Sequence, residues 1–393
     1  MNSVDAALLV VDDNEDNRYT LTRRLNREGY TNLTTANDGR EALNLLASRQ
    51  FDLVLLDIMM PDVNGYDVLE QMKASGKLHE VPVIMISALS EMDSVVRCIE
   101  LGAEDYLNKP FNPTLLRARV GATLEKKRLR DELRRNLERL ELEFDAARSL
   151  QLGMLPRRYP DWSPEQPVRL HAVMEPAREV GGDLYDYFYA SSDRLCFLVG
   201  DVSGKGAPAA MFMARTRSLV RMAGELWRDW RSEAVEPAHI VEAVNRELYQ
   251  NNDDRMFVTL FLGFLHTRTG ELNFINAGHP LPQLLRAMGK VEPVDNKPGL
   301  PLGVRRNTKY ETHTLMLRPG DAVFVYSDGV TEAMNEEGAL YSPERLDREL
   351  QGLLGADPVE IVRAIKEKVD AFTGTAPKAD DVTALALRWF PAL

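Results

Sequence analysis

The chain has 393 residues, well beyond one typical domain of about 150 residues, so a single fold is not expected to account for it. With 44% hydrophobic and 27% charged residues it is not a disordered protein. Its formal net charge of −12, from 48 basic and 60 acidic side chains, argues against a nucleic acid as partner. No apolar run approaches the roughly 18 residues of a membrane span, and the first residues do not form a signal-peptide pattern. We therefore expect a cytoplasmic protein with no membrane partner.

The first part of the chain alternates short apolar strands with amphipathic helices. We predict strands at Leu8–Val11, Leu53–Leu56 and Val83–Ile86, separated by helices such as Asp16–Glu28 and Gly39–Ser48. Strands that are apolar throughout and alternate with helices are typical of a parallel sheet covered on both faces. The fold class of this part is therefore α/β.

A long helix is predicted from about Asn112 to Leu155, because Gly and Pro are absent between Gly121 and Gly153. Apolar residues recur along it at alternating spacings of four and three, at Leu133, Leu137, Leu140, Phe144 and Ala147. This seam favours a two-stranded coiled coil that links two copies of the chain. A solvated helix that packs on its own domains remains an alternative.

After Pro156 the sequence changes to strands separated by glycines. The expected strands are Leu195–Val199, Phe257–Leu265, Glu271–Ile275, Ala322–Tyr326 and Val382–Arg388. Two helical blocks are expected among them, Ala209–Trp230 and Ala238–Tyr249. The pattern indicates a second α/β domain with hairpin-like strands.

Three carboxylates are predicted to meet at one edge of the first sheet. Asp12 and Asp13 directly follow the first strand, and Asp57 ends the second predicted strand. Such clustered oxygen ligands repel one another unless a hard cation such as Mg²⁺ lies between them. Ser87 and Lys109 are expected at the same edge, where a hydroxyl and an ammonium can neutralise a phosphoryl group on Asp57.

Four strings carry a resemblance to the receiver domain of two-component response regulators: VVDDN at 10–14, LLDIMMPDVNG at 55–65, MISA at 85–88 and DYLNKPF at 105–111. The resemblance covers roughly residues 5–122 and implies a doubly wound, parallel, five-stranded sheet. It implies Asp57 as the phosphoacceptor, Mg²⁺ held by Asp12, Asp13, Asp57 and the carbonyl of Met59, a phosphate contact from Lys109, and Ser87 and Tyr106 as the switch residues. A cognate histidine kinase or phosphotransfer protein is the implied partner.

Aspartates stand beside glycines at sharp turns of the last 240 or so residues. They are Asp183, Asp201 and Asp328, and the pair Asp380 and Asp381 directly precedes a strand that begins at Val382. Each lies next to an apolar run, and an all-carboxylate set without Cys or His favours magnesium or manganese. Two such ions about 4 Å apart can activate a water for in-line attack at phosphorus.

Six strings of this region resemble the SpoIIE/RsbU-like branch of the metal-dependent (PPM) serine/threonine phosphatases. They are AARSLQLGMLP (146–156), EPAREVGGDLYDYF (175–188), VGDVSGKGAPAAMFM (199–213), NAGHPLP (276–282), VYSDGVTEAMN (325–335) and ADDVTALAL (379–387). The resemblance implies an α-β-β-α sandwich of two antiparallel sheets, and two Mn²⁺ or Mg²⁺ ions.

Catalytic roles carried over from this resemblance fall on the aspartates. Asp201 bridges both metals, Asp328 and Asp380 complete the first, and Asp183 with the carbonyl of Val202 holds the second. Asp381 is either a support or an alternative ligand. His279 is expected to be structural, and Arg178 is a weak candidate for a phosphate contact.

The expected organisation is a receiver domain at 1–122, a helical linker at 123–155 and a phosphatase domain at 156–393. The combination predicts a response regulator whose phosphorylation on Asp57 controls the phosphatase, with the sign of control open. The resemblance implies a phosphorylated anti-sigma-factor antagonist as substrate, in a partner-switching pathway, and the linker seam predicts a homodimer. A receiver-controlled adaptor that binds without turnover is the alternative, and a phosphatase of small metabolites ranks last.

Overall fold

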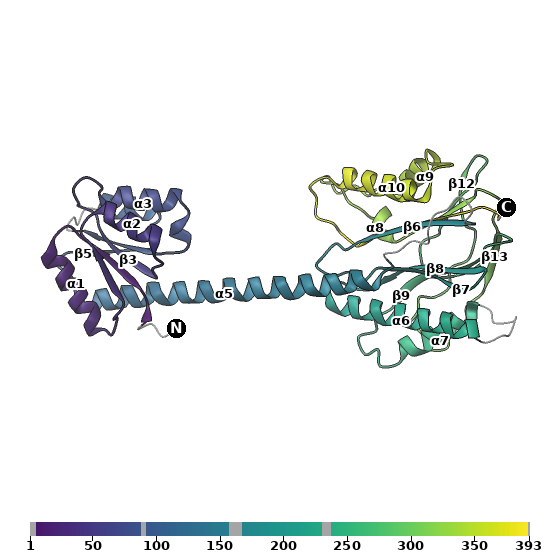
Figure 1. Cartoon of the computed structure of the whole chain (residues 1–393), viewed down its shortest axis with the longest axis horizontal. Coiled ribbons are helices and arrows are strands. Elements are labelled where there is room, and N and C mark those ends of the chain that lie inside the picture. Colours follow the sequence, from purple (N-terminus) through teal and green to yellow (C-terminus); the bar gives the residue numbers. More distant parts are fainter. Residues whose placement is uncertain (1–4, 88–91, 157–166, 230–236, 392–393) are drawn as a thin grey trace. The chain divides into compact units, whose positions relative to one another are not determined.

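The computed structural model describes residues 5–87, 92–156, 167–229 and 237–391, and the chain divides into two compact units, Met1–Glu141 and Leu142–Leu393. Ala88, at the end of the MISA string, and Trp230, at the end of an expected helix, lie outside the described residues. Figure 1 shows both units and labels many of their elements.

The first unit contains the expected parallel sheet, with the strand order β2-β1-β3-β4-β5. The strands are β1 Leu8–Val11, β2 Leu33–Ala36, β3 Leu53–Asp57, β4 Val83–Ser87 and β5 Asp105–Asn108. The helices are α1 Glu15–Arg27, α2 Gly39–Ser48, α3 Gly65–Ala74, the short 3₁₀ helix η2 Lys77–His79, α4 Met92–Leu101 and the start of α5 Pro113–Met154. The doubly wound, five-stranded arrangement is confirmed.

Successive residues of the central strands point into two different cores, one on each face of the sheet. Leu9 and Val11 pack with residues of α2, α3 and α4, whereas Leu8 and Val10 pack with α1 and the first turns of α5. Burial on both faces explains why these strands are apolar throughout. The strand β2 was not predicted from sequence, because only one of its four residues, Ala36, is buried.

Helix α5 is a single helix of 42 residues and agrees with the expected long helix to within one residue at each end. Asn112 caps it, since its Oδ1 accepts hydrogen bonds from the backbone N–H groups of Thr114 and Leu115. The seam side chains are exposed: Leu133 by 61%, Leu137 by 52% and Leu140 by 48%. Among the described residues of the first unit, therefore, nothing fully covers this apolar stripe.

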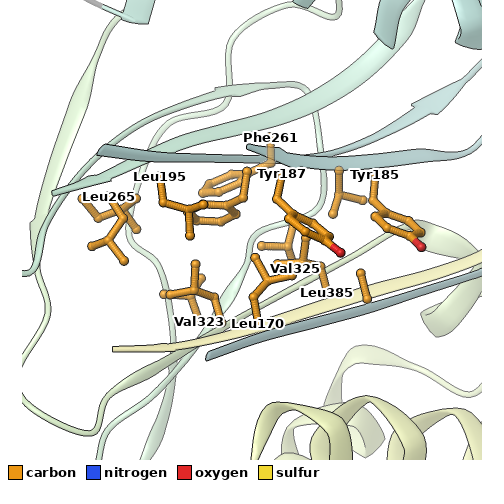
Figure 2. Close-up of a cluster of buried hydrophobic side chains, with 14 of the residues drawn as sticks. Leu170, Tyr185, Tyr187, Leu195, Phe261, Leu265, Val323, Val325 and Leu385 are labelled. Atoms are coloured by element: carbon orange, nitrogen blue, oxygen red, sulfur yellow. The ribbon is translucent and has the colours of Figure 1, made fainter. Parts of the chain in front are cut away.

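The second unit contains two five-stranded antiparallel sheets, ordered β13-β10-β9-β8-β7 and β12-β11-β14-β15-β6. Their strands are β6 Val168–Glu175, β7 Leu184–Ser191, β8 Arg194–Val202, β9 Val258–His266, β10 Glu271–Ala277, β11 Gln283–Leu285, β12 Val291–Pro293, β13 His313–Met316, β14 Ala322–Tyr326 and β15 Val382–Trp389. Figure 2 shows side chains of both sheets meeting in the core between them, with Leu170, Val323 and Leu385 opposite Tyr187 and Phe261.

Helices cover the outer face of each sheet, which completes the expected α-β-β-α sandwich. Helices α6 (Ala207–Asp229) and α7 (Pro237–Tyr249) pack on the sheet that contains β8, and α9 (Pro343–Gln351) and α10 (Pro358–Thr373) pack on the sheet that contains β14. A short helix, α8, spans Asp328–Thr331. The two expected helical blocks are present as α6 and α7, whereas α9 and α10, each of which begins with a proline, were not predicted.

Candidate functional site

The three acidic residues predicted at the edge of the first sheet lie together. Asp12 and Asp13 follow β1, Asp57 ends β3, and one carboxylate oxygen of each lies within 4.8 Å of the others. Within the part of the chain that the structure describes, this is the one group of three Asp, Glu, His or Cys residues so closely placed. We call these residues, with Ser87 and Lys109, the Asp57 pocket.

Lys109 connects two of the carboxylates. Its Nζ lies 2.8 Å from Oδ2 of Asp12 and 2.8 Å from Oδ1 of Asp57. Burial outweighs the effect of this ammonium and raises the pKa of Asp57 to about 6. Ser87 is buried at the end of β4, and its backbone carbonyl accepts a 2.7 Å hydrogen bond from the Lys109 N–H. The predicted hydroxyl, ammonium and carboxylates therefore share one edge.

The loop after Asp57 requires a glycine at its end. A Cβ on Gly65 would lie 2.2 Å from the carbonyl oxygen of Asp57, so no side chain fits there. Met59 is exposed in this loop, and the Tyr106 hydroxyl donates a hydrogen bond to Asn108. The clustered, purely oxygen donors of the pocket fit Mg²⁺, which prefers carboxylate and carbonyl ligands.

The aspartates of the second unit come from both sheets. Asp183 precedes β7 and Asp201 lies near the end of β8, in one sheet; Asp328 follows β14 and Asp380 precedes β15, in the other. We call these four residues the Asp201 site. The four aspartates come from strands of two different sheets. Their spacing along the chain therefore could not predict that they lie near one another.

The electrostatics of the Asp201 site show that its carboxylates act on one another. Burial, together with the negative charges of Asp328 and Asp380, raises the pKa of Asp201 to about 7. Burial and the charges of Asp201 and Asp381 raise the pKa of Asp183 well above its usual range. The site therefore concentrates carboxylates that a divalent cation would neutralise, and oxygen-only donors fit Mg²⁺ or Mn²⁺.

Asp381 holds the turn that carries Asp183. Its Oδ1 accepts a hydrogen bond from the backbone N–H of Ala177 at 2.8 Å, and its Oδ2 accepts from those of Gly182 at 2.6 Å and Asp183 at 3.3 Å. These contacts favour the supporting role over the alternative of a direct ligand. A Cβ on Gly181 would lie 2.3 Å from Oδ2 of Asp381, so the turn depends on glycine.

Ser327, which the sequence reading did not single out, supports the same turn from the other sheet. Its hydroxyl donates a 2.7 Å hydrogen bond to Oδ2 of Asp183 and accepts a 3.0 Å hydrogen bond from the Thr383 N–H. The carbonyl oxygen of Val202 is also close to this turn, because a Cβ added to Gly182 would lie 2.9 Å from that oxygen. The predicted ligands Asp183 and Val202 are thus neighbours.

Lys205 is a second residue that the sequence reading missed. Its Nζ lies 2.9 Å from Oδ2 of Asp380 and donates to the carbonyl of Ala379. The lysine stands in the VGDVSGKG string, only four positions after Asp201, but its partner lies 175 positions further along the chain. No local signal in the sequence could have found this contact.

The two remaining candidates are His279 and Arg178. His279 is buried, its Nδ1 pairs with the Thr259 hydroxyl at 2.9 Å, and burial lowers its pKa to about 3. A buried, neutral imidazole agrees with the structural role that we expected. Arg178 is exposed on the loop before Gly181.

Comparisons with known proteins match both units. The family model described as Stage II sporulation protein E (SpoIIE) matches residues 191–390, and that of the response regulator receiver domain matches residues 8–121. Protein IcfG of Synechocystis is 33% identical over 276 residues, which are 65% of this chain and 42% of that protein. The probable transcriptional regulator ycf27 of Guillardia theta is 44% identical over 119 residues, 30% of this chain and 45% of that protein. The chain thus spans less than half the length of these two curated relatives.

Solved structures resemble the second unit. The SiaA-PP2C domain of Pseudomonas aeruginosa has a TM-score of 0.56 at 21% identity, covering 65% of this chain and 98% of that one, so the two share a fold. The RsbU and RsbW domains of Rv1364c from Mycobacterium tuberculosis have a TM-score of 0.48 at 27% identity, covering 58% and 62%. Among the described residues, no helix combines the length and the apolar character that crossing a membrane requires.

Proposed function

Since the chain belongs to the SpoIIE family and carries a response regulator receiver domain, we propose that it is a metal-dependent protein phosphatase controlled by phosphorylation of Asp57. The observation that carries the proposal is that one chain holds both the close carboxylate cluster of the Asp57 pocket and, in the Asp201 site, carboxylates whose charges raise the pKa of Asp201. We assign residues 1–122 to the receiver, 123–155 to the linker and 156–393 to the phosphatase.

In the Asp57 pocket, the Asp57 carboxylate is the phosphoacceptor. Mg²⁺, held by Asp12, Asp13, Asp57 and the Met59 carbonyl, would supply charge neutralisation for the incoming phosphoryl group. Lys109, already 2.8 Å from Asp57, offsets negative charge as the phosphoryl group arrives. Ser87 and Tyr106 are the switch residues, which respond to the charge of the new phosphoryl group. A histidine kinase or phosphotransfer protein is the donor that fits this chemistry.

In the Asp201 site, two Mn²⁺ or Mg²⁺ ions would be held in a shared set of ligands. Asp201, Asp328 and Asp380 would hold one ion, and Asp201, Asp183 and the Val202 carbonyl would hold the other. The chemistry that the ions would supply is activation of a water and polarisation of the phosphoryl group. The chain itself orients Asp183 through Ser327 and Asp381. His279, with its pKa lowered to about 3, is neutral near pH 7, so no imidazolium is available there to act as a general acid for the leaving group.

Helix α5 is the element through which we propose that the receiver acts. Phosphorylation of Asp57 changes the packing of α5, and this change orders the turns that carry the aspartates of the Asp201 site. The exposed seam at Leu133, Leu137 and Leu140 supports a homodimer through the linker.

The substrate that we propose is a phosphoserine or phosphothreonine on a small anti-sigma-factor antagonist. The resemblance of the second unit to the SpoIIE/RsbU-like phosphatases supports this class, and the output would be partner switching. The net charge of −12 supports a protein rather than a nucleic acid as the interaction partner.

The experiment that tests the proposal is manganese-dependent phosphate release from a serine-phosphorylated antagonist. Wild type, Asp201→Asn and Asp57→Asn are compared with and without a small phosphodonor. We expect release that needs Asp201 and that responds to the donor only when Asp57 is present. Equal responses of wild type and Asp57→Asn would refute control by the receiver. Retained binding of the antagonist without turnover would favour the adaptor alternative.

A further inference from the structure

Gln151, three residues before the end of α5, makes a two-way contact with one backbone residue of the second unit. Its side chain is buried, its Nε2 donates to the Gly181 carbonyl at 2.6 Å, and its Oε1 accepts from the Gly181 N–H at 3.1 Å. The amide therefore satisfies both polar groups of Gly181, as a neighbouring strand would. No other side chain is hydrogen-bonded to Gly181 in the described part of the chain.

Gly181 opens the turn that delivers Asp183 to the Asp201 site. The next two backbone N–H groups, those of Gly182 and Asp183, are bound by Asp381. The turn is thus held from two sides, by Gln151 of α5 at Gly181 and by Asp381, directly before β15, at the following two residues. Removal of either support leaves buried backbone groups without partners, which only a shift of the turn can relieve.

The last turns of α5 are built into the core of the second unit. Leu155, directly after the helix, is 5% exposed in the core between the sheets, and Leu152 packs against that core. The seam residues Leu140 and Leu133, about three and five turns before Gln151, are exposed. Because the end of α5 is packed into this core whereas its middle is exposed, a change in how the end of the helix packs acts directly on Gln151.

We propose that Gln151 is a positioning residue through which α5 sets metal binding at the Asp183 side of the Asp201 site. The inference deepens the proposed function and rests on it. Asp183 reaches the second metal position only when the turn is drawn up by Gln151, so the seating of α5 sets metal affinity. Groups that orient metal ligands in this way typically contribute roughly 10- to 100-fold to affinity.

The test is a Mn²⁺ titration of the full chain by electron paramagnetic resonance of the free ion. Gln151→Met keeps the length of the side chain and removes both hydrogen bonds. Mn²⁺ can bind at both the Asp57 pocket and the Asp201 site. The binding that is lost in Asp201→Asn is therefore assigned to the Asp201 site. We expect Gln151→Met to weaken that part by roughly 10-fold or more, and high Mn²⁺ to restore phosphate release.

Asn245→Leu is the matched control. Asn245 is also a buried amide of the second unit that holds a loop in both directions, since its Nδ2 donates to the Arg305 carbonyl at 2.9 Å and its Oδ1 accepts from the Gly303 N–H at 2.9 Å. Gln151→Glu is the second variant of the linker residue, because it keeps the size and the acceptor for Gly181 and loses the donor. We expect unchanged Mn²⁺ affinity for the control and an intermediate loss for Gln151→Glu.

The outcomes separate this inference from the proposed function. If wild type shows no Mn²⁺ binding that depends on Asp201, the proposed phosphatase function itself is refuted. If wild type binds and Gln151→Met binds equally well, the inference alone is overturned. An equal loss in Asn245→Leu would also overturn it, because the effect would then belong to any buried amide of the unit.

Discussion

Lys205 Nζ lies 2.9 Å from Oδ2 of Asp380, so an ammonium of the chain stands where carboxylates of the Asp201 site gather. The same lysine lowers the pKa of Asp328, whose pKa is raised overall by burial and by the charges of Glu332 and Asp380. Lys205 therefore offsets part of the repulsion among these carboxylates in the metal-free protein. A metal ion that binds Asp380 must compete with it.

We predict that Lys205→Met raises the affinity for Mn²⁺ and lowers the melting temperature of the metal-free protein. Both partners are about 38% exposed, so solvent screens the pair, and the gain in affinity should be only about two- to fivefold. Isothermal titration and thermal unfolding in a chelator measure the two effects. Lys368→Met, which removes an ion pair with Glu349 between α10 and α9, is the control and should leave Mn²⁺ affinity unchanged. Weaker Mn²⁺ binding by Lys205→Met would contradict competition.

Asp380 and Asp381 are neighbours in sequence, but we predict opposite consequences of their replacement. Asp381→Asn loses charge-assisted hydrogen bonds to the backbone of Gly182 and Ala177 and should destabilise the fold by about 3 kcal/mol. Asp380→Asn removes one charge from a cluster of carboxylates that repel one another. The free energy of unfolding of the metal-free variant should therefore equal or exceed that of wild type, whereas its affinity for Mn²⁺ should fall. Urea unfolding in a chelator, together with Mn²⁺ titration, measures both quantities. Similar losses of stability in the two variants would show that the assignment of roles is wrong.

The Asp57 pocket was predictable in detail because a parallel sheet brings the carboxyl ends of its strands to one edge. Asp12 and Asp57 each end an apolar run, so the sequence places them without knowledge of packing. The fold of the second unit followed from its family strings, but its contacts did not. Gln151 meets Gly181, and Lys205 meets Asp380, through the stacking of separate elements, which no periodicity encodes.

We predict that His279 makes the second unit sensitive to acid. Burial lowers its pKa in the folded state to about 3, whereas an unfolded chain binds the proton near pH 6.5. Between these values the unfolded state holds more protons, so the contribution to stability is complete above about pH 6.5 and declines as pH falls, by about 3 kcal/mol at pH 4. Urea unfolding at pH 7 and pH 4 should show a smaller decline for His279→Gln than for wild type.

The exposed histidine of α7 provides the control for this pH dependence. His239→Gln should decline with pH as wild type does, because it leaves the buried imidazole of His279 in place. Carboxylates also titrate in this range, but their contribution is common to all three proteins and cancels in the comparison. The same pH slope for His279→Gln and wild type would mean that the buried imidazole takes up no proton on unfolding.

The apolar seam of α5 gives the last prediction, a loss of the homodimer on placing a charge within it. Leu137 and Leu140 occupy successive seam positions and are 52% and 48% exposed. In a coiled coil each lies against its counterpart in the second copy, so Leu137→Glu brings two carboxylates together in an apolar seam. Sedimentation equilibrium should then show a dimer for wild type and a monomer for the variant. Leu142, 71% exposed and outside the seam, is the matched control, and Leu142→Glu should remain dimeric. A monomeric wild type would instead favour the solvated single helix, and the receiver would then have to act on the phosphatase within one chain.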